Sequence, residues 1–140
     1  RFMHFGPLPK ETAETFRRVR KIEAEMITHT VVGADVSDIF KTAVREYEEA
    51  GYKDEWMRLH QGGPTGYATR EYLATPYDDE KVFDNQAYTW NPSITGTKSE
   101  DTFIVDQNGF EVLTVSGGWP MVDVRAKNGT VISRPDVLIR

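Results

Sequence analysis

The first fifty residues carry apolar side chains at the spacing of two amphipathic helices. Residues 11–29 and residues 36–50 each have an apolar position every three or four residues. This period gathers apolar side chains on one helix face, so the sequence predicts a helix over each run. Asp35 or Ser37 is the expected N-cap of the second helix, and Gly51 its terminator. The apolar positions are Ala13, Phe16, Val19, Ile22, Met26 and Ile27 in the first run and Ile39, Phe40, Ala43, Val44 and Tyr47 in the second.

The remainder of the chain has the pattern of short strands. Residues 87–94 and 102–106 are predicted strands, and the pair Asn108-Gly109 predicts a hairpin that joins the second of them to a strand over residues 110–115. A second hairpin is predicted at Asn128-Gly129, between strands over residues 121–125 and 130–133. Helices followed by antiparallel strands predict an α+β domain.

The segment between the helices and these strands is less regular. Residues 56–60 are compatible with a strand, and residues 62–66 contain three glycines and a proline. Because glycine and proline break regular structure, we expect an irregular turn over residues 62–66. His60 lies at the edge of this turn.

Charge and composition exclude several classes of protein. The formal net charge is -5, and the basic cluster Arg17, Arg18, Arg20 and Lys21 alternates with Glu14, Glu23 and Glu25, which predicts a solvated helix face rather than a nucleic-acid surface. No apolar run approaches the roughly 18 residues of a membrane span. At 140 residues, the length predicts one domain, residues 1–140.

The absence of cysteine limits the chemistry of any site. Without thiols, a metal ion would need histidine and carboxylate ligands. The lack of cysteine and of a signal peptide predicts a cytoplasmic protein. Because the chain starts at Arg1 and not at methionine, we expect a fragment or a processed product.

Three polar positions are candidates for a site. His60 precedes a glycine-rich turn, Asn91 precedes Pro92, and Glu100 lies in a run of polar residues. Histidine and glutamate are ligands for divalent ions, whereas Asn91 is a neutral amide. Structural alternatives are open at each position: a hydrogen-bonded histidine, a turn-forming Asn91, and a Glu100 that forms a salt bridge with Lys98. The tryptophans Trp56, Trp90 and Trp119 are expected to anchor the core.

These motifs resemble one family. Two helices, then His60-Gln61-Gly62-Gly63, Asn91-Pro92-Ser93-Ile94 and the run from Lys98 to Thr114, look like the second half of the pita-bread metallopeptidases. That superfamily includes methionine aminopeptidase, prolidase, aminopeptidase P and the metal-free creatinase. The resemblance covers residues 1–115, and residues 116–140 are expected to form an extra hairpin extension outside it. It implies the C-terminal portion of a pita-bread fold, with two helices on a curved, mostly antiparallel sheet.

The resemblance also implies a site. Active members hold two divalent ions, such as Mn, Co or Zn, with two Asp, one His and two Glu ligands, and His60 and Glu100 match the histidine and the final glutamate. Asn91 stands where the family has a glutamate, and Tyr67 stands where it places a second, catalytic histidine. Asn91 and Gly63 are the expected substrate-cleft residues. Tyr67 is expected to be half-buried.

The family's two aspartate ligands have no counterpart in this chain. Asp78 and Asp79 lie in a loop-like segment and do not match them. We therefore expect an incomplete metal site that binds metal weakly or not at all.

Three functions follow as expectations. The first is a part of an Xaa-Pro-type metallo-aminopeptidase that acts on peptides with a free N-terminus. The second is a non-catalytic peptide-binding or interaction module on the same fold, and the third is a metal-free, creatinase-like amidinohydrolase. Since an isolated half would expose the surface that its sister half covers, we also expect a homodimer.

Overall fold

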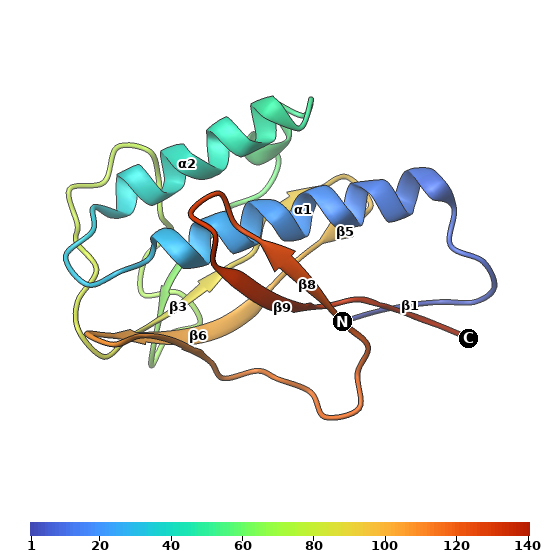
Figure 1. Ribbon diagram of the computed structural model, residues 1–140. Helices are drawn as coiled ribbons and strands as arrows, with labels where there is room; N and C mark the ends of the chain where they lie inside the picture. The colour runs from blue at the N-terminus through green and yellow to red at the C-terminus, as the bar shows by residue number, and fades with distance from the viewer.

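The computed structural model describes residues 1–140 and has two helices on one side of a sheet (Figure 1). Helix α1 is Lys10–His29 and helix α2 is Val36–Glu49, as the apolar period predicts. A short link joins them, so the two helices pack against each other as neighbours. Neither helix is long and apolar enough to cross a membrane.

The main sheet has four antiparallel strands in the order β2-β3-β6-β7. Their bounds are Gly62–Thr65, Gln86–Trp90, Asp101–Asp106 and Gly109–Val112. The predicted Asn108-Gly109 hairpin joins β6 to β7, and Asp106 Oδ1 accepts hydrogen bonds from the backbone N–H of Asn108 at 2.7 Å and of Gly109 at 3.1 Å. The α+β architecture predicted from the sequence is confirmed.

The remaining strands form small two-stranded pairs. Strands β4 (Ser93–Ile94) and β5 (Thr97–Lys98) form one hairpin, and β8 (Met121–Arg125) and β9 (Val131–Pro135) form the hairpin predicted at Asn128-Gly129. Strand β1 (Phe2–His4) pairs in parallel with β10 (Val137–Ile139). In Figure 1 the β8–β9 hairpin runs alongside α1, and β8 is in contact with this helix.

One face of the main sheet packs under the helices and forms the core. Tyr88 and Trp90 of β3 and Phe103 and Val105 of β6 are fully buried. Trp90 donates its indole N–H to Thr30 Oγ1 at 2.9 Å, at the end of α1. Side chains alternate between the faces of a strand, so the residues between these point to the opposite, open face.

Two local predictions were wrong. Residues 56–60 do not form a strand, because Glu55–Met57 is a 3-10 helix followed by a turn. Residues Gly62–Thr65, expected to be irregular, form strand β2. The glycines make this pairing possible, since Gly62 has φ +106° and a Cβ there would lie 2.1 Å from the backbone oxygen of Thr89.

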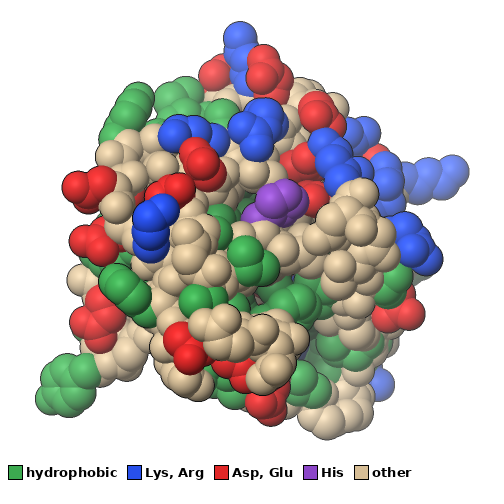
Figure 2. Space-filling model, turned by 60° about the vertical axis from the view of Figure 1, so that its left-hand side comes forward, with side chains coloured by type: hydrophobic (Ala, Val, Ile, Leu, Met, Phe, Trp, Pro, Cys, Tyr) green, Lys and Arg blue, Asp and Glu red, His purple; other side chains and the backbone are tan.

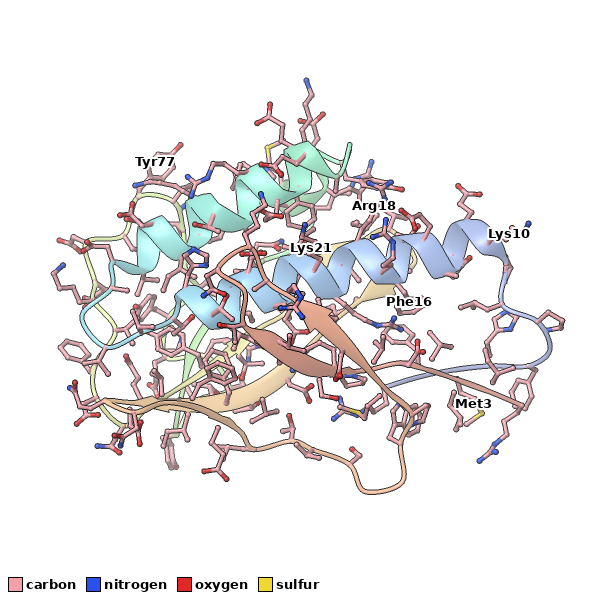
Figure 3. All side chains as sticks on the ribbon, in the orientation of Figure 1. Met3, Lys10, Phe16, Arg18, Lys21 and Tyr77 are labelled. Atoms are coloured by element: carbon pink, nitrogen blue, oxygen red, sulfur yellow. The ribbon has the colours of Figure 1, made fainter.

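The charged face predicted on α1 is solvated only in part. Arg17 and Arg18 pair with Glu14 near the surface, but Glu23 and Glu25 are fully buried and Arg20 is nearly so. Figure 3 shows Phe16 pointing from α1 toward β1 and Arg18 pointing away from it, toward α2. Partners for the buried charges come from residues 127–136, which a local pattern cannot reveal.

The tryptophans differ in burial. Trp90 is a core anchor, as expected. Trp56 and Trp119 are only partly buried: Trp56 packs edge-on against Phe40 with ring centroids 5.6 Å apart, and Trp119 donates its N–H to the Asp136 backbone oxygen at 2.9 Å.

Candidate functional site

His60 and Glu100 lie near each other at one end of the open sheet face. His60 is the exposed residue just before the strand β2 segment, and Glu100 lies between β5 and β6. The pKa of His60 is lowered, first by partial desolvation and then by the positive charges of Arg70 and Lys98, while Glu100 acts in the opposite direction. The imidazole is therefore neutral at pH 7 and interacts with all three charged groups.

Two basic residues hold the Glu100 carboxylate. Arg70 Nη2 lies 3.1 Å from Glu100 Oε1, and Lys98 Nζ lies 3.8 Å from Oε2. The predicted salt bridge between Glu100 and Lys98 is present, and Arg70, which the sequence analysis did not single out, is the closer partner. Arg70 comes from the loop after β2, so only the folded chain brings it to Glu100.

Asn91 is buried at the end of β3. It follows β3 directly, and its backbone N–H donates to the Gln61 backbone oxygen at 3.0 Å. Only 3% of Asn91 is exposed, and its Oδ1 has no hydrogen-bond partner. A buried amide oxygen without a partner is unfavourable, so this position is suited to receive a donor.

The hydroxyl of Tyr47 ties the His60 and Asn91 segments to α2. It lies 2.9 Å from Gln61 Oε1 and 2.9 Å from the Ser93 backbone oxygen, and it accepts the Ser93 N–H at 2.7 Å. Burial raises the pKa of Tyr47, so the hydroxyl stays protonated and can donate. Gln61, which follows His60, and Ser93, two residues after Asn91, therefore share one anchor.

The structure does not bring Gly63 and Tyr67 to this group. Gly63 is buried, and a Cβ at this position would lie 2.5 Å from the Tyr72 backbone oxygen, so the following loop covers it. Tyr67 is fully exposed at the tip of that loop instead of half-buried. The glycine-rich loop extends this side chain into solvent, where it has no packing partner.

A buried ionic network lies behind Glu100, on the helix side of the sheet. Arg134 donates to both carboxylate oxygens of Glu23, at 3.0 and 2.6 Å, and to Asp101 Oδ2 at 2.7 Å. Ser99 donates its hydroxyl to Glu23, and Asp101 donates its backbone N–H to Glu23 Oε1 at 2.9 Å. Both neighbours of Glu100 in sequence are thus fixed by one buried carboxylate.

Sequence reasoning missed this network. Glu23 was assigned to a solvated helix face, and Arg134 lies 111 positions away from it in a hairpin that the family resemblance did not cover. The one residue in the sequence that could have indicated this network is Asp101, a second acidic residue directly after Glu100 in the run from Lys98 to Thr114.

The donor set of this chain does not fit a two-metal site. No group of three or more His, Cys, Asp or Glu side chains gathers in a way that could hold a metal ion. Of the candidate positions, Asn91 is an amide, and both oxygens of Glu100 face cations. Hard divalent ions prefer several anionic oxygens, which these residues do not offer.

Comparisons with known proteins identify the fold. No family model matches the chain. An uncharacterized peptidase of Staphylococcus epidermidis is 34% identical over 125 residues, which cover 81% of this chain and 34% of the relative. The chain thus spans about a third of the length of the curated relatives it matches.

Solved structures give the same result at lower identity. An X-Pro aminopeptidase from Thermotoga maritima matches 99% of this chain and 36% of its own, with a TM-score of 0.75 and 16% identity. An Xaa-Pro dipeptidase from Bacillus anthracis has the same TM-score and the same coverage at 19% identity. The N-terminal domain of the FACT subunit SPT16 from chickpea matches 79% of this chain and 30% of its own, with a TM-score of 0.65 and 17% identity.

The chain has the pita-bread fold of the Xaa-Pro aminopeptidases, prolidases and dipeptidases. The resemblance inferred from its motifs is confirmed, and its curated relatives are peptidases. Because the match to the X-Pro aminopeptidase covers 99% of the chain, residues 116–140 lie almost entirely inside the shared fold.

Proposed function

We propose that this chain forms the peptide-binding part of a protein of the Xaa-Pro peptidase kind. The observation that supports this most is that the Asn91 backbone N–H bonds to the Gln61 backbone oxygen beside His60, while Glu100 lies close enough to His60 to affect its pKa. Solved proteins with this fold include an X-Pro aminopeptidase and an Xaa-Pro dipeptidase. The ligand in this proposal is a short peptide with a free N-terminus.

The chemistry of two side chains suits such a terminus. An ammonium group is a compact, three-proton donor. Asn91 Oδ1 is an acceptor without a partner, and the neutral imidazole of His60 has one acceptor nitrogen. Together they offer one exposed acceptor, at His60, and one buried acceptor, at Asn91.

Peptide titration followed by NMR tests the proposal. Adding Ala-Pro to the chain is expected to shift backbone signals around His60 and Asn91, and N-acetyl-Ala-Pro is expected to bind at least tenfold more weakly. Asn91→Ala and His60→Ala should each weaken Ala-Pro binding. His29→Ala is the matched control, since His29 lies at the end of α1 and bonds to Glu25. Equal binding of the acetylated peptide would contradict the proposal.

Binding without hydrolysis is the second candidate. Two features favour binding without hydrolysis. Asn91 is an amide and has no anionic oxygen for Mn, Co or Zn, and the Glu100 carboxylate already faces Arg70 and Lys98. An activity assay on a longer protein that includes the family's two aspartates would distinguish the two candidate functions. Release of proline from Ala-Pro in the presence of these ions would support a metallo-aminopeptidase, and its absence would support a binding module.

The creatinase-like alternative has less support. It needs an acid or base beside the substrate, and Tyr67, at the position of the family's histidine, is fully exposed at a loop tip. Creatine hydrolysis that depended on His60 would revive this alternative.

We also propose that the isolated chain forms a homodimer through its open sheet face. Leu113 and Val115, which continue from β7, are 53% and 64% exposed. Light scattering at high micromolar concentration tests this proposal, and a monodisperse monomer would contradict it.

A further inference from the structure

The group around Glu100 has more positive than negative charge. Arg70 and Lys98 are cationic, Glu100 is anionic, and His60 is neutral at pH 7. Each oxygen of the Glu100 carboxylate faces one cation. The group as a whole therefore carries one net positive charge.

Neighbouring acidic residues do not offset this charge. Asp101 points to the helix side of the sheet, where it binds Arg134. Glu71, the other acidic residue close to Arg70 in sequence, accepts the Ala68 backbone N–H at 3.2 Å. A divalent cation at this position would approach two fixed cations and one occupied carboxylate.

The same group is accessible and has unused donors. The side chains of Arg70, Lys98 and Glu100 are 16%, 30% and 39% exposed. Arg70 Nη1 donates to its neighbour's backbone oxygen at 2.6 Å and Nη2 to Glu100, while Nε is buried and has no acceptor. Lys98 Nζ, 3.8 Å from the Glu100 carboxylate, forms no hydrogen bond, and an accessible ammonium beside a guanidinium suits an oxyanion.

We propose that Arg70 and Lys98 form an oxyanion-binding site beside Glu100. The ligand class is a small carboxylate or phosphate. Arg70 is the deciding residue, because it pairs with the one strong metal-ligand candidate and places a second positive charge beside that of Lys98. This inference goes beyond the proposed peptide binding and does not depend on it.

Calorimetric titration at constant ionic strength tests the site with three probes: sodium phosphate, sodium acetate and manganese chloride. Phosphate or acetate is expected to bind, and the tighter of the two identifies the preferred oxyanion. Arg70→Gln and Lys98→Gln should each weaken that binding at least tenfold. Glu100→Gln should strengthen it several-fold, since it removes the competing carboxylate.

The control variant is Arg58→Gln, an exposed arginine that pairs with Glu55 on the 3-10 helix. It should leave anion binding unchanged, and circular dichroism should show that all variants are folded. Lys98→Gln keeps the test decisive if Arg70→Gln does not fold. Absence of binding by both anions, or binding that is unchanged in Lys98→Gln, would overturn the proposal. So would manganese binding that is tighter than anion binding and lost in Glu100→Gln.

Failure here is distinguishable from failure of the peptide proposal. The probes contain no peptide, and Asn91→Ala should not change anion affinity. A chain that binds Ala-Pro but neither anion would refute only the oxyanion site.

Discussion

Arg134 is the central residue of the buried ionic network. It is fully buried between Glu23 and Asp101, which are themselves buried. Desolvation raises the pKa of Glu23, and the charge of Arg134 is the main opposing influence. The carboxylates are tolerated in the core because this guanidinium and several hydrogen bonds compensate their lost hydration.

Arg134→Met is therefore expected to destabilise the fold by about 3–5 kcal/mol, because it leaves two carboxylates buried without their partner. Urea denaturation measures the loss. Arg17→Met is the matched control, since Arg17 is an exposed arginine paired with Glu14, and it should have little effect. Equal effects of the two variants would refute the structural role of the network.

The titration of His60 is the second prediction at this scale. Desolvation and the charges of Arg70 and Lys98 lower its pKa in the folded chain. The unfolded chain then binds the proton more tightly, so the contribution of His60 to stability is present above pH 6.5 and is lost as the pH falls below it. NMR should give a His60 pKa below 6.5 that rises in Arg70→Gln. A pKa above 6.5 in the unmodified chain would contradict the electrostatic description of the site.

Part of this site could be predicted from residues alone. Motif matching selected His60, Asn91 and Glu100, and the structure places them near one another. It could not reveal Arg70, because an arginine in a loop has no periodic pattern and becomes a partner of Glu100 only when the loop folds back over β2. Tyr67 illustrates the converse, since a position inherited from a motif says nothing about where a loop tip points.

At the scale of elements, glycine determines how β2 joins the sheet. Gly62 combines φ +106° with a Cβ position 2.1 Å from the Thr89 backbone oxygen. A side chain at this position would push β2 away from β3 and displace the neighbouring His60 segment. Glycine often interrupts regular structure, but at this position it allows the backbones of β2 and β3 to approach closely.

Gly62→Ala is expected to destabilise the chain severely, by about 3 kcal/mol or more, because strain and a backbone clash add. Gly117→Ala is the control, since Gly117 has an ordinary φ and no atom within 4 Å of a new Cβ. Thermal unfolding of both variants measures the difference. A Gly62→Ala chain with unchanged stability would show that β2 does not need this contact.

Helices and hairpins were predictable because their signals are local. The apolar period of α1 and α2 and the Asn-Gly turns lie within a few residues of the structures that they specify. The burial of Glu23 and Glu25 was not predictable in this way. Their partners Arg134 and the Lys127 backbone N–H lie more than a hundred positions away.

At the scale of the whole molecule, the face drawn in Figure 2 carries charged side chains of both signs, and several Lys and Arg side chains gather at its upper right. The net charge of -5 gives no support to nucleic-acid binding.

The C-terminal hairpin is expected to be essential for the fold. Removing residues 116–140 takes away Arg134 and the Lys127 contacts, so Glu23 loses its guanidinium partner and Glu25 loses the Lys127 backbone N–H. We expect the truncated chain to keep some helical signal in far-ultraviolet circular dichroism and to lose the near-ultraviolet signal of packed aromatic residues. Cooperative unfolding of the truncated chain, similar to that of the full chain, would contradict this expectation.

The network around Glu23 also constrains the order in which the chain can fold during synthesis. Helix α1 leaves the ribosome before the arginine that neutralises its inner carboxylate, which follows 111 residues later. Until then, docking α1 on the sheet would bury an unpaired negative charge. Helix α1 should therefore pack stably on the sheet only after β9 has emerged and Arg134 can pair with Glu23.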